Sequence, residues 1–247
     1  MEPNADSAFF DSHSIPDQAV GTGPADMLGA IFYGGERHSR LRAASLDCIV
    51  GPNDPRYPRD ADVLDLRLDD AALLKNLKEP PAHWWPLCGA SRDDGKPVIL
   101  HLNAADFSAL ARGLSRLARA FPALRLIVDP FLGGKASKWQ AGVCLAEESN
   151  IWLTTRGLYA AEKSWPERSE REALHFTVGE VGAGKLLFAS GMTPAQLNLQ
   201  GTKPAEWLKS VPFLEPAQRE LILRKNVDDA FAGLIDAVQP THLRSGK

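Results

Sequence analysis

Three residues that can bind or transform an anion lie at the ends of apolar stretches of this sequence. His13 follows the run 8–10, His101 lies at the end of the run 97–102, and Arg156 follows the run 150–154. Short apolar runs of this kind predict buried strands. Because parallel strands end at one edge, we expect the three side chains to converge on one cavity. An imidazole can move a proton, and a guanidinium fork can hold a carboxylate. The residues therefore predict a site for a small anion, most simply a carboxylate.

Asp129 follows the apolar run 124–128 and adds a carboxylate to this predicted site. It leaves two interpretations of Arg156 open. The guanidinium is either a bidentate clamp for a substrate carboxylate or one half of an internal salt bridge to Asp129 or Glu180. His101 and His13 likewise have a plain interpretation, as hydrogen-bond partners of neighbouring loops.

The stretch 96–134 predicts the unit that positions these groups, a strand, a helix and a second strand. Residues 97–102 and 124–128 are the two apolar runs. Between them, apolar residues recur at steps of three and four and form one stripe, which consists of Phe107, Leu110, Leu114, Leu117 and Phe121. Pro122 ends the predicted helix. We expect two adjacent parallel strands with a right-handed crossover.

Further apolar runs extend this unit into a larger α/β fold. A helix is predicted from Pro24, with Met27, Leu28 and Ile31 as its apolar face. Residues 84–88, 137–148, 166–181 and 216–235 are also expected to be helical. Strands are expected at 9–13, 46–50, 62–66, 97–102, 124–128, 150–154 and 185–189.

Length and composition favour one globular domain spanning residues 1–247, with loose termini at 1–7 and 240–247. The chain has 247 residues, 44% hydrophobic content and a net charge of −3. A net charge of −3 gives no indication of the basic surface that binds nucleic acid. No apolar run approaches the ~18 residues that span a bilayer. The three cysteines lack metal-ligand spacing, so buried thiols in a reducing cytoplasm are expected. A homodimer is left open as the oligomeric state.

Three segments resemble the amidohydrolase-2 family, a family of metal-dependent hydrolases and decarboxylases on TIM barrels. The resemblance covers residues 84–235. It rests on PVILHL with FPALRLIVDPFLGG (97–134), on KLLFASGMTP (185–194) and on EPAQRELILRKNVDDAFAG (215–233), in which Asn226 matches a family position. The resemblance implies an α/β, TIM-like (β/α) barrel. Since the family has eight strands and only seven are found, the barrel is expected to be distorted or short of one strand–helix unit.

The family's metal motif is only partly present. The resemblance implies that His13 and His101 match metal ligands, whereas Ile15, Pro130 and Gly191 stand where the family has two histidines and a proton-shuttling aspartate. A catalytic zinc site needs three protein ligands. We therefore expect a weak metal site at His13 and His101 that stays unoccupied, and no cofactor; a divalent metal such as zinc is the disfavoured alternative.

Two functions follow from the residues together with the resemblance. The first is a divergent hydrolase that acts on a small carboxylate or lactone without the usual metal. His101 would be its general base or carbonyl polariser, Asp129 an orienting partner and Arg156 the clamp, with Asn103 and Ser190 as further substrate-binding residues. The second is a catalytically inactive pseudoenzyme that binds a small anion or a partner protein.

Overall fold

The computed structural model describes about three fifths of the chain. The described residues are 9–14, 27–33, 42–46, 49–50, 63–67, 79–102, 104–131, 139–158, 167–191 and 203–232. The description covers the backbone only for residues 9–50, for Asp65, Arg67 and His101, and at the starts of two helices, for residues 104–106, 108 and 167–169. The predicted loose termini at 1–7 and 240–247 lie outside it.

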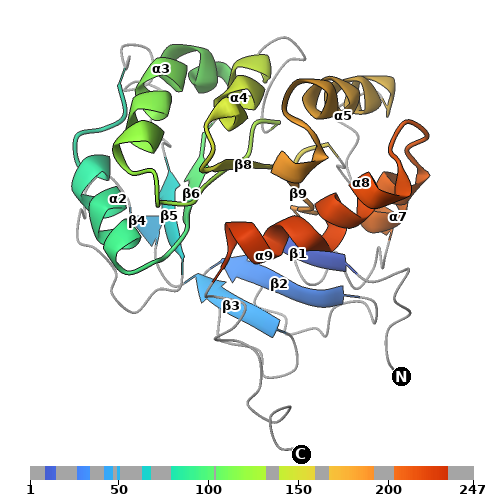
Figure 1. The fold of residues 1–247 in the computed structure, drawn as a ribbon, viewed down its shortest axis with the longest axis horizontal. Coiled ribbons are helices and arrows are strands. Elements are labelled where there is room, and N and C mark those ends of the chain that lie inside the picture. The colour runs from blue at the N-terminus through green and yellow to red at the C-terminus, as the bar shows by residue number, and fades with distance from the viewer. Residues whose placement is uncertain are drawn as a thin grey trace, which may run out of the picture.

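All strand pairs in the described residues are parallel, and neighbours in the sheets follow the order of the chain (Figure 1). A three-stranded sheet contains β1 (Phe9–Ser14), β2 (Met27–Tyr33) and β3 (Arg42–Leu46). A six-stranded sheet contains β4 (Ile49–Val50), β5 (Leu64–Arg67), β6 (Val98–His101), β7 (Leu126–Val128), β8 (Ile151–Thr154) and β9 (Leu186–Leu187). Sequential parallel strands require crossover connections, so the α/β class predicted from the sequence is confirmed.

Helices follow most strands of the six-stranded sheet. They are α2 (Trp84–Asp93), α3 (Ala104–Ala120), α4 (Gln140–Cys144), the turn η1 (Leu145–Glu147), α5 (Glu167–Val181) and the turn η2 (Ala183–Lys185). The chain continues with α7 (Lys203–Ser210), α8 (Pro216–Glu220), the π-helical turn η3 (Leu221–Lys225) and α9 (Asn226–Ala230). Among the described helices, none is long and apolar enough to cross a membrane.

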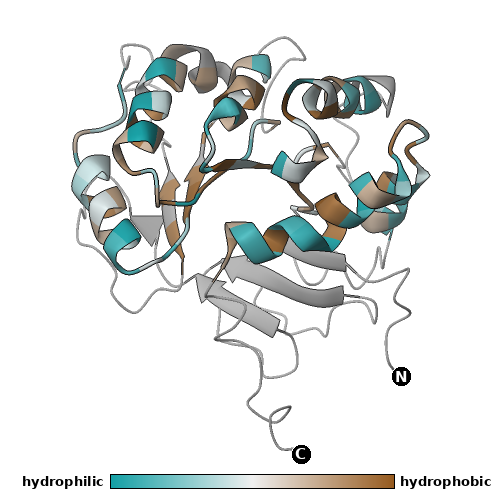
Figure 2. Ribbon diagram, in the orientation of Figure 1, coloured by the Kyte–Doolittle hydropathy of each residue, from teal (hydrophilic) through white to brown (hydrophobic). Residues whose placement is uncertain are grey.

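Alternate residues of the six-stranded sheet belong to two different hydrophobic layers. Leu100, Val128 and Leu153 pack in one core together with apolar residues of α2, α3, α4 and α5. Ile99, Ile127 and Leu187 pack on the other face with three residues of the C-terminal segment, Val227, Ala230 and Phe231. Strands covered on both faces are continuous apolar runs, and Figure 2 shows the middle strands of this sheet, β6, β7 and β8, as largely brown ribbons beside helices that alternate in polarity. The face that carries Ile99 and Ile127 is called the inner face below.

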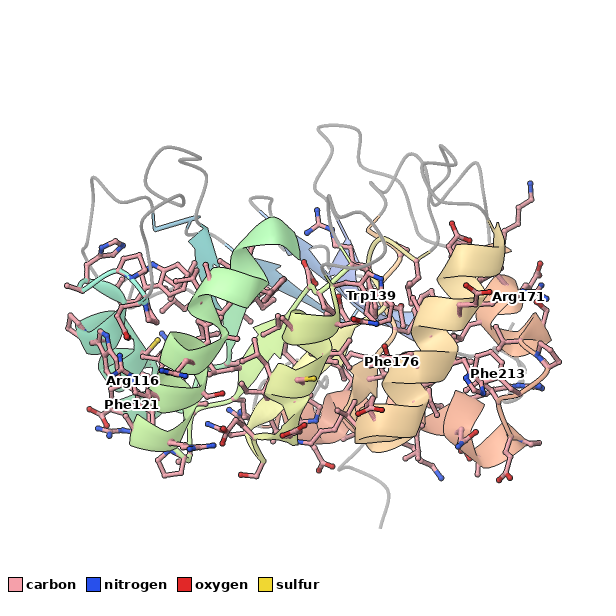
Figure 3. The ribbon with its side chains drawn as sticks, turned by 90° about the horizontal axis from the view of Figure 1, so that it is seen from above. Arg116, Phe121, Trp139, Arg171, Phe176 and Phe213 are labelled. Carbon is pink, nitrogen blue, oxygen red and sulfur yellow. The ribbon has the colours of Figure 1, made fainter. Side chains whose placement is uncertain are left out.

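The outer layer is closed by aromatic contacts between neighbouring helices. Trp139 packs edge-on against Phe176, with ring centroids 5.2 Å apart, and Figure 3 shows both side chains between α4 and α5. On the other side of α3, Trp85 lies 6.1 Å from the ring of Phe121. Trp84 of α2 is fully buried, so packing in the core accounts for this residue.

The structure corrects the prediction around residues 24–33. Residues 27–33 form β2, a strand, rather than the apolar face of a helix beginning at Pro24. The run MLGAIFY is too short for periodicity to separate a buried strand from a buried helix. Its connection to β3, residues 34–41, is also shorter than the dozen or more residues of a usual parallel crossover. The connection between β2 and β3 is therefore shorter than a usual strand–helix unit needs.

The strand count also differs from the seven that the sequence predicts. The described residues contain nine strands, of which β3 and β4 are only two residues apart. The predicted strand at 46–50 overlaps both of them. Counted as one interrupted strand, β3 and β4 leave eight strand positions, and the additional position is β2. Helix α7 was also not predicted, although Pro204 in its first turn is a usual start residue.

Asn150 ties the end of α3 to the start of β7. Its side-chain Nδ2 lies within hydrogen-bond distance of the carbonyl oxygens of Ala118 (3.1 Å), Phe121 (2.9 Å) and Leu124 (2.8 Å). We expect Asn150→Leu to lower the free energy of unfolding by about 1–3 kcal/mol, because buried carbonyls lose their donor. Urea denaturation measures the change. Asn150→Asp, of similar size but without the donors, should be at least as destabilising at neutral pH, and full stability of either variant would contradict this role.

Candidate functional site

Two polar residues end neighbouring strands on the inner face of the sheet. Asp129 follows β7 two residues after Ile127, and Thr154 ends β8 two residues after Trp152, which packs on the inner layer. Strand alternation therefore places both on the face of Ile127. Both side chains are fully buried. This explains why a carboxylate and a hydroxyl meet at the carboxyl ends of β7 and β8.

The Asp129 carboxylate is bonded through both of its oxygens. The Thr154 hydroxyl donates to Asp129 Oδ1, and Arg156 Nη1 donates to Asp129 Oδ2 at 3.1 Å. The backbone N–H of Arg156 donates in turn to Thr154 Oγ1 at 3.2 Å. Thr154 thus links the carboxylate to the backbone of the residue that carries the guanidinium.

Of the two interpretations of Arg156, the structure shows the internal salt bridge to Asp129. The side chain of Asp129 has 0% exposure, and that of Arg156 retains 17%. Glu180, the other predicted partner, is exposed on α5. A buried carboxylate is stable beside a cation, so the guanidinium compensates Asp129. The pair is neutral as a whole, and an anion that reaches Arg156 has to share the guanidinium with Asp129.

The chain after β9 passes close to the side chain of Arg156. Gly191 has a φ of +64°, and a Cβ built on it would lie 2.9 Å from Arg156 Cγ and 3.3 Å from Arg156 Nε. The preceding Ser190 is buried, with 4% exposure. Residue 191 therefore has no room for a side chain while Arg156 keeps its place.

Two hydrogen bonds hold this passing segment against β8. Thr155 Oγ1 accepts from the backbone N–H of Ala189 at 2.9 Å and lies 3.3 Å from the Ala189 carbonyl oxygen, to which it donates. On the opposite side, a Cβ at Gly157 would lie 2.9 Å from the carbonyl oxygen of Phe131. Residues 154–157 are thus packed between the segments that follow β7 and β9.

The predicted site residues fall into two groups. Asp129 and Arg156 are brought together, and Ser190 lies in the adjoining segment. His13 is in β1 and His101 ends β6, where its backbone pairs with Arg67, one position beyond the pair Leu100–Val128. The side chains of both histidines, and all of Asn103, lie outside the described residues. Their predicted roles stay predictions.

Thr154 was missed by the sequence analysis. Thr154 is the last residue of the predicted strand 150–154, and an apolar run alone does not indicate which face its last residue occupies. Its position two residues after an inner-face residue, beside a strand that ends in aspartate, is the pattern that identifies it.

The described residues offer little for a metal ion. They contain no group of three or more His, Cys, Asp or Glu side chains that could hold one. Asp129, the acidic residue at these strand ends, is bonded to a cation through Oδ2 and to a hydroxyl through Oδ1. If Asp129 bound a metal ion, the ion would bring a second positive charge next to the Arg156 guanidinium, and the two cations would repel each other. The donor set described here does not fit a divalent ion at Asp129.

The described cysteines do not provide a nucleophile. Burial raises the pKa of the Cys88 thiol to about 12, so the reactive thiolate is scarce at neutral pH. The pKa of Cys144 is also raised, first by partial burial and then by Glu147 and Glu180. Cys144 is exposed, which corrects the expectation that the thiols are buried. Cys48 lies outside the described residues.

Comparison with known proteins identifies the fold. No model of a known protein family matches the chain, and no curated protein does. Among solved structures, an amidohydrolase from Burkholderia multivorans with bound zinc is similar over 83% of this chain and 84% of that chain, with a TM-score of 0.57 and 14% identity. A probable 2-pyrone-4,6-dicarboxylic acid hydrolase from Acinetobacter baumannii, with citric acid bound, is similar over 90% and 98%, with a TM-score of 0.59 and 14% identity.

A third structure, 2,6-dihydroxybenzoate decarboxylase from Rhizobium, is similar over 83% of this chain and 84% of that chain, with a TM-score of 0.55 and 15% identity. The resemblance found in the sequence segments is thereby confirmed at the level of the fold.

Proposed function

We propose that the chain binds a small carboxylate or a carboxylated lactone at Arg156 and hydrolyses it without a metal ion. The observation that carries the proposal is the Arg156–Asp129 pair at the carboxyl ends of β7 and β8. In α/β barrels, groups at this edge of the strands act on substrates. The Arg156 side chain as a whole keeps 17% exposure, so a ligand can approach it from solvent.

The names of the similar structures favour this class of ligand. One is a probable hydrolase of 2-pyrone-4,6-dicarboxylic acid with citric acid bound, and another is a decarboxylase of 2,6-dihydroxybenzoate. Each of these compounds is a small carboxylate. The pyrone is also a lactone, so it combines the anion and the ester that the proposed site would take.

Each residue has a distinct role in the proposed reaction. Arg156 holds a carboxylate of the substrate, and Asp129 orients the guanidinium. His101 takes a proton from the attacking water and passes it to the ring oxygen when the C–O bond breaks. Asn103 and Ser190 add hydrogen bonds to the substrate. The product is the open-chain acid, in which the former ester carbon has become a carboxylate.

A second function is a binding protein without catalysis. It is favoured by Gly191, which has no side chain to move a proton, and by Asp129, whose two oxygens already accept hydrogen bonds. The same ligands would bind at Arg156, and none would be turned over.

Thermal unfolding with 2-pyrone-4,6-dicarboxylate and citrate tests the proposed ligand class. A ligand at 100 times its Kd should add about 2.7 kcal/mol to the free energy of unfolding and raise Tm in proportion. An uncharged lactone of similar size serves as the control and should have no effect. Loss of the pyrone absorbance separates hydrolysis from binding alone. If neither anion raises Tm at millimolar concentration, the proposal is wrong.

A further inference from the structure

The geometry points to Gly191 and Thr154 as positioning residues that set the place of the Arg156 guanidinium. This inference rests on the proposed function, because it concerns the same anion site. Neither residue would touch the ligand. Each would act on anion recognition through Arg156.

Gly191 acts by leaving space. The Cβ of any other residue would lie 2.9 Å from Arg156 Cγ, closer than real Cβ contacts. Cγ is near the root of the arginine side chain, so a shift there carries the whole guanidinium with it. A side chain at position 191 therefore separates Arg156 Nη1 from Asp129 Oδ2.

The backbone at residue 191 is not free to retreat from the collision. Ala189, two residues earlier, is held by two hydrogen bonds to the Thr155 hydroxyl. Ser190 between them is buried. These two hydrogen bonds tie the segment 189–191 to Thr155, the residue next to Arg156. The flexible side chain of Arg156 therefore moves before this segment does.

Thr154 acts by fixing the partner of Arg156. Its hydroxyl donates to Asp129 Oδ1 and accepts from the backbone N–H of Arg156 at 3.2 Å. One oxygen atom thereby orients the carboxylate and holds the backbone from which the guanidinium extends. Valine has the same shape without the hydroxyl, whereas serine keeps the hydroxyl.

A matched glycine separates the collision from backbone strain. Gly95 has a φ of +67°, close to the +64° of Gly191, but a Cβ there would meet no atom within 4 Å. Gly95→Ala thus introduces the same left-handed strain far from Arg156. The difference between Gly191→Ala and Gly95→Ala reports the contact with Arg156.

Calorimetric titration of the full chain with 2-pyrone-4,6-dicarboxylate tests the inference. We expect Gly191→Ala and Thr154→Val each to weaken binding by about tenfold or more, and Gly95→Ala and Thr154→Ser to stay within about twofold of the unmodified protein. A merely structural role would lower Tm in Gly95→Ala and Gly191→Ala alike without separating their affinities. Equal affinities of Gly191→Ala and Gly95→Ala for the pyrone would overturn the role of Gly191, and full affinity of Thr154→Val that of Thr154.

Crystal structures of Gly191→Ala and Gly95→Ala without ligand test the placement independently of binding. We expect Arg156 Nη1 to lie beyond about 3.5 Å from Asp129 Oδ2 in Gly191→Ala only. If the unmodified protein binds no anion but the guanidinium moves as expected, the proposed function fails and the placement by Gly191 stands. An unmoved guanidinium in Gly191→Ala overturns the role of Gly191, whatever the ligand.

Discussion

Replacing Arg156 with methionine should lower the free energy of unfolding by about 3 kcal/mol. Methionine has similar length but no charge, so the fully buried Asp129 loses the cation beside it. Breaking a buried ion pair from one side is strongly destabilising, at about 3–5 kcal/mol. The lower end of this range applies because the Arg156 side chain keeps 17% exposure. Urea denaturation at neutral pH measures the loss.

A second variant separates the charge from the packing. Asp129→Asn combined with Arg156→Met removes both charges, and the asparagine can still bond to the Thr154 hydroxyl. We expect this double variant to recover most of the lost stability, because no buried carboxylate remains. The surface pair of Arg119 with Glu148 is the control, since 73% of the Arg119 side chain is exposed and Arg119→Met should change little. A loss in Arg156→Met no greater than in Arg119→Met would contradict the buried pair.

Leu114→Ala should destabilise the chain by about 2–5 kcal/mol. Leu114 is fully buried in α3 and packs in the core between the helices and the outer face of the sheet. Truncation removes apolar contacts and leaves a cavity in a rigid layer of strands and helices, which relaxes only in part. Chemical denaturation of the purified variant gives the magnitude.

The opposite face of the same helix supplies the control for Leu114. Arg112 is exposed on α3, and alanine is a good helix former, so Arg112→Ala should stay within about 0.5 kcal/mol of the parent. Equal effects of the two substitutions would mean that the stripe of α3 does not face the sheet.

The unit around α3 could be predicted because its sequence pattern and its packing agree. The stripe of Phe107, Leu110, Leu114 and Leu117 is buried as a set, and the apolar runs on either side are β6 and β7. Residues 27–33 could not be assigned in the same way. A run of seven apolar residues is too short to show whether its periodicity is that of a strand or of a helix. Its partner strands, β1 and β3, also lie far along the sequence from the βαβ unit around α3.

The closeness of Asp129 and Arg156 was predictable, but the partner that the guanidinium takes was not. Asp129 and Arg156 follow neighbouring strands, so their closeness follows from strand order alone. Whether the guanidinium faces a ligand or the aspartate depends on side-chain geometry, which strand order does not determine. The role of Gly191 was hidden for the same reason. The sequence shows only that residue 191 is a glycine, whereas its positive φ and its closeness to Arg156 Cγ are properties of the folded chain.

The most direct test of Arg156 as the anion anchor is a calorimetric titration with 2-pyrone-4,6-dicarboxylate at neutral pH. It compares the unmodified protein, the double variant Asp129→Asn with Arg156→Met, and the control Arg119→Met. The double variant is the right probe because it removes the guanidinium without leaving a buried charge. We predict binding to the unmodified protein and to Arg119→Met, and none to the double variant. Equal affinity in all three would show that the anion is held elsewhere.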